Sequence, residues 1–248
     1  MQETEGIVLR TYKLREQDKI CVVLTKKLGK IRGVFHNPSR RISTNGIYEE
    51  PFSEIRLQVY GREGQQLVTL KPIELLSTVF NQAIEPKILT FISYAAELLD
   101  AFIPEGEPSD VHYRLARALT FNLKTENIDD LRVYLEIWIL RLAGLLPNLD
   151  HCGKCRVALS TENWIAADGT PLCRNCGGQY GEYLGLEDRT AWASVLAHSP
   201  GELPAISANV RVTLSLITQR LIRRALDKEP NSLRSFSVFD LPGMAGSN

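Results

Sequence analysis

The sequence has little of what an enzyme usually carries. Its 248 residues contain no G-x-x-x-x-G-K-[ST] loop, no G-x-G-x-x-G turn, no H-E-x-x-H helix and no G-x-S-x-G elbow. The sequence has four histidines, and none stands at a spacing from a carboxylate that indicates a proton-transfer pair. They are His36, His112, His151 and His198. These absences favour a protein that is not an enzyme.

Long apolar runs are also missing. The run Ile137–Leu140 is broken by Arg141 and falls far short of the roughly 20 residues that a membrane-spanning helix requires. Residues 1–5 are acidic and lack the basic start and the apolar core of a signal peptide. We therefore expect no membrane insertion and no export, and a cytoplasmic protein.

The first 80 residues alternate between apolar and polar side chains. This period of two recurs around residues 7–11, 31–35, 55–59 and 67–70, and residues 20–25 form a β-branched apolar run that also predicts a strand. Five short strands bury their apolar faces by curling into a small barrel, and a long linker with a basic strand pair is typical of an OB-fold. The sequence predicts an OB-fold nucleic-acid-binding domain over residues 1–80.

After Pro86 the hydrophobic period changes to 3.6. This period predicts helices at about 88–102, 111–119, 128–142, 187–196 and 206–225. The predicted fold is therefore α+β and multidomain, with a five-stranded barrel followed by a helical domain over residues 81–248. An insertion at about 150–180 interrupts the helical domain.

Four of the five cysteines lie in this insertion, with the spacing C-x2-C-x17-C-x2-C. In a chain without an export signal this spacing indicates zinc rather than disulfides. Two turns of this kind present four thiolates to one ion and leave no position for water, which indicates a structural role. The predicted zinc ligands are Cys152, Cys155, Cys173 and Cys176. The alternatives are a redox pair or two chance pairs.

Positive charge is concentrated near the start of the chain, although 29 basic and 29 acidic side chains balance overall. Residues 10–41 hold ten basic and two acidic side chains, a net charge of +8. Lys and Arg neutralise phosphates, and exposed aromatic rings stack on unpaired bases. Charge runs are most often only solvated faces, and aromatic residues in small barrels are most often core. The predicted DNA-binding residues are Arg10, Lys13, Lys26, Lys27, Lys30, Arg32, Arg40, Arg41 and Arg56.

The segment LAGLLPNLDHCGKC, residues 142–155, resembles the helix end, Leu-Pro-x-Leu turn and first knuckle of the RecO family of recombination mediators. Residues 5–10 and the hairpin of residues 24–30 are similar to the first strands of that family. The resemblance implies a bacterial, nucleoid-associated protein that binds single- and double-stranded DNA and promotes annealing. It also implies that the protein works with RecR and single-strand-binding protein to load RecA. Residues 36–41 depart from the family, whose members often carry a longer basic run there, and this departure implies weaker DNA contact.

A site for the acidic C-terminal tail of single-strand-binding protein, which ends in apolar residues, follows from the same resemblance. The predicted partner-binding arginines are Arg220, Arg223 and Arg224 beside Leu221, and Arg114 and Arg117 beside Leu115. The alternative is that these arginines only balance nearby acids. Two other functions stay open at this point: a zinc-knuckle RNA-binding or ribosome-associated factor, and a protein-interaction module whose barrel binds no nucleic acid.

Overall fold

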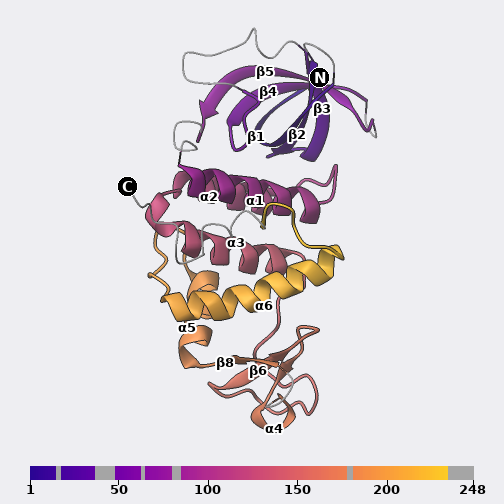
Figure 1. The fold of residues 1–248 in the computed structure, drawn as a ribbon. Coiled ribbons are helices and arrows are strands. Elements are labelled where there is room, and N and C mark those ends of the chain that lie inside the picture. Colours follow the sequence, from indigo (N-terminus) through magenta and orange to yellow (C-terminus); the bar gives the residue numbers. More distant parts are fainter. Residues whose placement is uncertain (15–17, 37–47, 63–64, 80–84, 178–180, 234–248) are drawn as a thin grey trace. The chain divides into compact units, whose positions relative to one another are not determined.

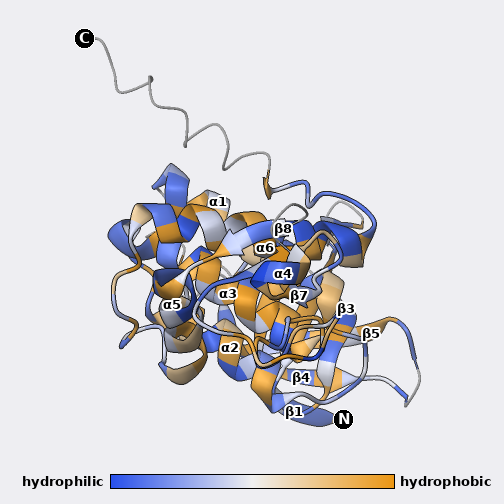
Figure 2. Ribbon diagram, turned by 90° about the horizontal axis from the view of Figure 1, so that it is seen from below, coloured by the Kyte–Doolittle hydropathy of each residue, from blue (hydrophilic) through white to orange (hydrophobic). Residues whose placement is uncertain are grey.

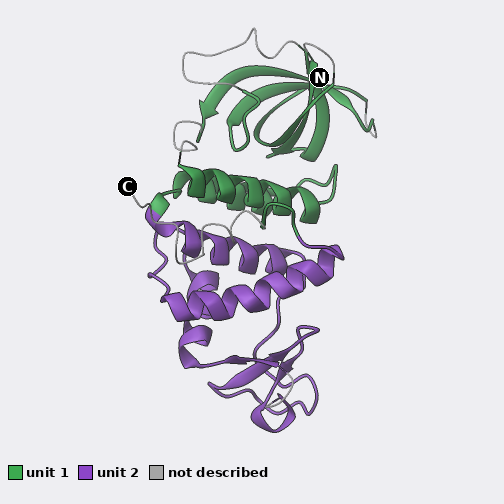
Figure 3. Cartoon of the chain, in the orientation of Figure 1, with its two compact units in different colours: residues 1–125, 230–248 green, residues 126–229 purple. Residues whose placement is uncertain are grey.

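A computed structural model describes residues 1–14, 18–36, 48–62, 65–79, 85–177 and 181–233. The chain forms two compact units, which Figure 3 distinguishes by colour. Unit 1 comprises residues 1–125 and 230–248, and unit 2 comprises residues 126–229. The predicted domain boundary at residue 80, which separates barrel from helices, stays a prediction.

Unit 1 begins with a closed five-stranded barrel of strand order β1-β2-β3-β5-β4, in which β4 also pairs with β1 (Figure 1). Its strands are β1 (Gln2–Lys13), β2 (Asp18–Thr25), β3 (Gly29–His36), β4 (Glu54–Tyr60) and β5 (Val68–Ser77). Every pairing is antiparallel except β3 with β5. The predicted five-stranded barrel is therefore confirmed.

Alternating side chains of the strands fill the barrel. Its interior is built from Val8, Cys21, Val23, Phe35, Ile55, Leu57, Val59 and Leu70. Gly33 permits the parallel contact between β3 and β5, because a Cβ there would lie 2.5 Å from Leu70 Cγ and 2.8 Å from the Val68 carbonyl oxygen. Ile7 and Leu9 are also fully buried, in a strand that α1 and α2 contact.

Two helices, α1 (Pro86–Phe102) and α2 (Asp110–Phe121), complete unit 1 together with the segment after residue 229. Glu54 of β4 is buried and accepts hydrogen bonds from Tyr113 Oη, 2.6 Å, and Arg117 Nε, 3.0 Å, of α2. Burial and this hydrogen bond raise the pKa of Tyr113, so the phenol stays protonated and donates. Buried Glu97 of α1 accepts from the backbone N–H groups of Asn231 and Ser232. These polar contacts tie the distant segments of unit 1 together.

Unit 2 combines three long helices with a small sheet. Its elements, after the short η2 (Thr125–Asn127) at the boundary, are α3 (Ile128–Leu142), β6 (Asn163–Ala166), β7 (Pro171–Leu172), α4 (Arg174–Gly177), β8 (Gly181–Leu184), α5 (Leu186–Ala197) and α6 (Ala208–Leu226). α3 packs against α5 and α6, and Figure 2 shows the hydrophobic residues along α3. β6 is the central strand of the sheet, between β7 and β8. The structure thus confirms a helical region with a cysteine-bearing insertion.

The helices of the described ranges are too short or too polar to cross a membrane.

Candidate metal centre and nucleic-acid interface

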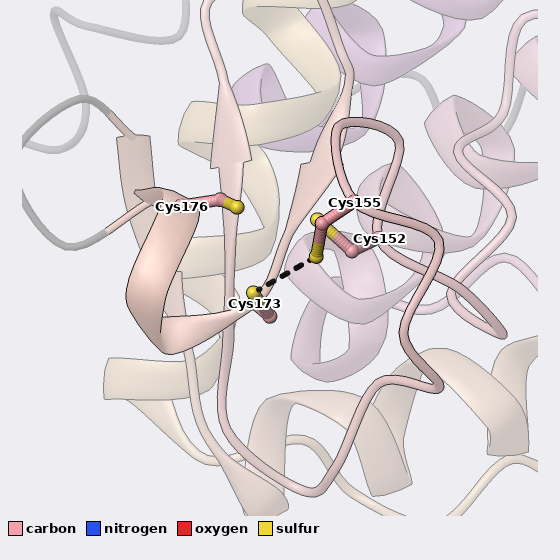
Figure 4. Close-up of side chains that lie close together, drawn as sticks. All are labelled: Cys152, Cys155, Cys173 and Cys176. Carbon is pink, nitrogen blue, oxygen red and sulfur yellow. Dashed lines mark hydrogen bonds between the residues drawn. The ribbon is translucent and has the colours of Figure 1, made fainter.

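Four cysteine side chains meet in the insertion of unit 2. Cys152 and Cys155 come from the loop after α3, Cys173 follows β7, and Cys176 lies in α4. Their sulfur atoms all lie within 4.8 Å of one another, and the Sγ atoms of Cys155 and Cys173 are 3.7 Å apart (Figure 4). Because all four meet at one point, the arrangement is a single cluster rather than two independent pairs.

Close backbone approaches shape the first turn of the cluster. Gly153 donates its N–H to the Pro171 carbonyl at 2.8 Å, and a Cβ on Gly153 would lie 2.4 Å from Thr170 Cγ2. The turn closes where Arg156, with a positive φ of 65°, donates to the Cys152 carbonyl at 2.9 Å. A side chain at residue 153 would therefore block the contact that shapes this turn.

Close backbone approaches also shape the second turn, at residues 173–177. Cys176 and Gly177 donate their N–H groups to the Cys173 carbonyl at 3.0 and 2.9 Å. A Cβ on Gly177 would lie 2.8 Å from the Cβ atoms of both Leu172 and Trp164. This turn therefore packs closely against β6 and β7, which fixes the positions of the Cys173 and Cys176 side chains.

The pKa values of two thiols of the cluster are shifted in opposite directions. Burial raises the pKa of Cys152, but backbone hydrogen bonds from Cys155, Cys173 and Lys154 lower it more, to about 6. Hydrogen bonds with Cys155 and Cys173 raise the pKa of Cys176 to about 12. One thiolate therefore forms readily, whereas further thiolates in the same small volume repel it. A bound cation is what allows all four to be deprotonated together.

The geometry fits one four-coordinate metal ion. A tetrahedral site with metal–sulfur distances of about 2.3 Å has sulfur–sulfur edges of about 3.8 Å, close to the 3.7 Å between Cys155 and Cys173. His151 is exposed beside the cluster and no fifth ligand is required. Cys21 lies in the barrel core, where burial raises its pKa to about 12 and keeps the thiol protonated. The four predicted ligands therefore form a cluster that is able to hold one metal ion.

The predicted DNA-binding residues of unit 1 lie in several different environments. Lys26 and Lys27, in the turn between β2 and β3, and Lys13 at the end of β1 are exposed. Lys26 lies 3.5 Å from Glu5, and Lys27 donates to the Glu3 carbonyl at 3.3 Å. These weak surface contacts leave all three ammonium groups accessible to phosphate.

Asp100 of α1 pairs with two further predicted residues. Lys30 is buried, with only 4% of its surface exposed, and its ammonium group donates to both the carbonyl and the carboxylate of Asp100. Arg10 Nε lies 3.3 Å from the same carboxylate. The assignment of Lys30 to a DNA-contacting surface is therefore corrected, because the fold uses its charge internally.

Two further predicted residues are exposed in part and paired. Arg32 Nε lies 2.6 Å from Glu105, and Arg56 Nη1 lies 2.5 Å from Glu74. Both pairs are at the surface, where such contacts contribute little. Arg40 and Arg41 lie outside the described residues.

The aromatic residues of the barrel divide into two groups. Phe35 and Phe52 are buried and Tyr48 is half-buried, so these rings belong to the packing. Tyr12 and Tyr60 are 45% and 36% exposed. The exposed rings provide a surface on which unpaired bases can stack.

Sequence reasoning missed two exposed cations of the barrel, Arg62 and Lys71. Arg62 follows β4, and Lys71 lies opposite Gln58 across the β4–β5 pair, on the same face as Tyr60. The signal for Lys71 was the strand alternation itself, which the prediction ended at residue 70 although β5 continues to Ser77.

The predicted partner-binding arginines all have neighbours of opposite charge or polarity. In unit 1, Arg114 pairs with Asp110 at 2.8 Å and Arg117 with Glu54. In unit 2, Arg220 donates to the carbonyls of residues 165 and 166, and Arg223 lies 3.6 Å from Glu229. The pKa of Asp168 is lowered mainly by hydrogen bonds from Thr170 and to a smaller extent by the positive charge of Arg224.

Leu115 and Leu221, the predicted apolar partners of these arginines, are 6% and 5% exposed. Neither leucine therefore lines an open groove. A different hollow of about 340 Å³ lies between α5 and the start of α6, with Leu186, Ala191, Pro204 and Val210 among its lining residues.

Comparison with known proteins gives the same assignment for both parts of the chain. Residues 1–79 match the family model for the recombination protein O N terminal, and residues 85–234 match that for the recombination protein O C terminal. The DNA repair protein RecO of Koribacter versatilis is 32% identical over 82% of this chain and 83% of its own. The RecO protein of Geobacter metallireducens is 33% identical over 74% and 75%.

Proposed function

Because the chain belongs to the RecO family of recombination proteins, we propose that it is a DNA repair and recombination mediator that binds DNA through its barrel. Members of this family are mediators rather than enzymes. One observation supports DNA binding most directly: Lys13, Lys26 and Lys27 are exposed on the same small barrel as Tyr12 and Tyr60.

The residues supply two kinds of contact. Exposed lysines neutralise phosphates of single or double strands without reading sequence, and exposed tyrosines stack on bases only where these are unpaired. Arg10, Arg32 and Arg56 exchange a carboxylate partner for a phosphate when DNA binds, and Arg40 and Arg41 extend the same basic segment. A protein that neutralises two strands at once lowers their repulsion, which promotes annealing of complementary strands.

We assign zinc to the cysteine cluster, as one structural ion per chain. Four thiolates form a soft ligand set that fills the coordination sphere of zinc and leaves no open position. The ion would therefore stabilise the fold of the insertion and would have no catalytic role. In the cell, the protein would act in the bacterial cytoplasm at the nucleoid.

The partners follow from the family. We expect the protein to act with RecR, and with the C-terminal tail of single-strand-binding protein, in loading RecA onto covered single strands. Arg114, Arg117, Arg220, Arg223 and Arg224 stay candidates for the tail. A fluorescent tail peptide titrated against the full chain tests this, because removal of its final Phe abolishes binding at an apolar groove. Equal binding of a scrambled peptide of the same charge would contradict a specific groove.

Competition tests the nucleic-acid assignment. A labelled single-stranded DNA bound to the full chain is displaced by unlabelled DNA or by RNA of the same sequence. We expect unlabelled DNA to compete at least as well as RNA. We also expect the protein to accelerate the annealing of complementary DNA strands. Preferential displacement by RNA would favour an RNA-binding factor, and failure to bind either polymer would favour a protein-interaction module.

A further inference from the structure

The barrel carries a hollow of about 540 Å³, and its lining includes Lys30 and Arg32 of the predicted DNA-binding set. It lies within unit 1, between the start of β3, the end of β4, the start of β5 and the segment of residues 105–108. A volume of this size is typical of sites for small molecules.

One wall of the hollow is fixed by backbone contacts. Gly106 donates its N–H to the Lys30 carbonyl at 2.9 Å, which joins the segment after α1 to β3. Gly29, with φ of 69°, allows this approach, because a Cβ there would lie 2.1 Å from the Glu107 carbonyl oxygen. Arg32 and Glu105 pair across the same junction at 2.6 Å.

A second part of the lining, around residues 61–68, is also fixed by hydrogen bonds and packing. Gln65 accepts from the Arg62 N–H at 3.1 Å and donates to the Leu67 carbonyl at 2.7 Å. Gly61 lets this turn pack on β5, since a Cβ would lie 2.6 Å from Val68 Cγ1. These contacts place the exposed side chains of Arg62 and Gln66 at the hollow.

The lining combines three kinds of group. Ile31, Val59 and Val68 provide apolar surface. Gln66 and Glu105 provide amide and carboxylate groups that hydrogen-bond the edge of a heteroaromatic ring. Arg62 supplies a guanidinium group suited to a phosphate.

The distribution of charge selects among ligands. A phosphate alone gains nothing from the apolar surface and is repelled by Glu105, which already pairs with Arg32. The buried charge of Lys30 is compensated by Asp100 and adds no net attraction. A ligand with a flat, polar-edged ring and a phosphate at one end fits all the groups together.

We propose that this hollow holds one unpaired nucleotide of a DNA single strand, with its base against Ile31 and Val68 and its phosphate at Arg62. This assignment rests on the proposed DNA binding by the barrel. It adds that the protein distinguishes strands whose bases are free from a bare phosphate backbone. Gln66 and Glu105 contact the base edge, and Arg62 contacts the adjoining phosphate.

The test compares two fluorescein-labelled 15-mers by anisotropy with the full chain: oligo-dT and an oligomer of abasic spacers with the same number of phosphates. The wild type should bind oligo-dT about tenfold more tightly, since one stacked and hydrogen-bonded base contributes on the order of this factor. Gln66→Ala should reduce that preference about threefold to tenfold without weakening abasic binding. Arg62→Ala should weaken both oligomers.

The control is Lys124→Ala, which removes an exposed cation of the same unit that does not line the hollow. It should leave the preference unchanged. Equal binding of both oligomers by the wild type, or an unchanged preference in Gln66→Ala, would overturn the nucleotide site while leaving DNA binding by the barrel intact. Binding of neither oligomer would overturn the proposed function itself.

Discussion

Two lysines of one hairpin show how position changes the role of a charge. Lys26 is exposed in the turn after β2, whereas Lys30, four residues later in β3, is buried against Asp100. The sequence places both in the same basic segment, and only the packing of α1 on the barrel separates them. Exposure, rather than charge, decides which lysine is available to DNA.

Lys30→Ala should therefore act on stability. Removing the buried ammonium group takes away two hydrogen bonds to Asp100 and leaves its carboxylate with the partly exposed Arg10 as a charged partner. The free energy of unfolding should therefore fall by about 2–3 kcal/mol. Lys26→Ala, the matched control, should change stability by less than about 0.5 kcal/mol and should weaken DNA binding. Urea unfolding followed by circular dichroism checks both, and equal stability of the two variants would contradict the internal role of Lys30.

Glu97 makes a pH-dependent contribution at the same scale. Burial raises the pKa of this carboxyl, but hydrogen bonds from the Ser232 hydroxyl and from the N–H groups of Ser232 and Asn231 lower it more, to a value below the ordinary 4.5. A lowered pKa in the folded state means that the carboxylate stabilises the fold above pH 4.5, and that this contribution is lost as pH falls through the folded pKa.

Glu97→Gln should accordingly lower the free energy of unfolding by about 1–2 kcal/mol at pH 7. The difference from the wild type should shrink as pH falls below 4.5, because the wild-type carboxyl then becomes neutral as well. Unfolding curves at a series of pH values measure this difference. A difference that stays constant across the series would contradict a role for the carboxylate charge.

At the scale of elements, the cysteine insertion is the part most dependent on its ligands. Its strands β6, β7 and β8 have two to four residues each, too few to be stable alone. The cysteine cluster brings together the turn before β6 and the turn between β7 and β8. Folding of the insertion and binding of the ion should therefore be coupled.

Cys173→Ser should lower zinc content and melting temperature together. Elemental analysis and thermal unfolding of the purified protein measure the two quantities. Cys21→Ala is the matched control, since it removes a thiol from the barrel core and should lower stability without loss of zinc. A Cys173→Ser protein that melts like the wild type, or a metal-free wild type of full stability, would contradict the structural role.

The sequence predicted the elements better than their ends and contacts. Helix α1, at Pro86–Phe102, agrees with its 3.6 period, and the four cysteines meet as their spacing indicates. Strand β5 continues past the predicted residue 70, through Pro72, because register shifts opposite β4 accommodate the proline. Ser109 precedes α2, and its hydroxyl hydrogen-bonds His112 instead of capping the helix.

The remaining differences come from long-range packing. The contact of Glu97 with residues 231 and 232 joins positions more than 130 residues apart. No local sequence pattern predicts a contact of this range. The same holds for Asp100, which pairs with Lys30 across 70 residues. The cysteine cluster could be predicted from spacing alone. The proposed DNA-binding surface also depends on which cations pair with acidic groups inside the fold, and spacing does not give this.

For the whole molecule, the balance of 29 basic and 29 acidic side chains means that no net charge attracts DNA. The proposed DNA binding therefore requires attraction by the local surface of the barrel, where Lys13, Lys26 and Lys27 are exposed. Salt dependence then counts these contacts directly, because each neutralised phosphate releases counterion.

The most direct measurement is the affinity of the full chain for a single-stranded oligonucleotide at several salt concentrations. Log affinity should fall linearly with log salt, and Lys26→Ala/Lys27→Ala should make the slope shallower by about 1.4, which corresponds to about 0.7 per lost contact. The control double variant Lys124→Ala/Lys228→Ala changes the net charge equally and should leave the slope unchanged. Equal slopes and affinities for the wild type and Lys26→Ala/Lys27→Ala would contradict DNA binding through this surface of the barrel.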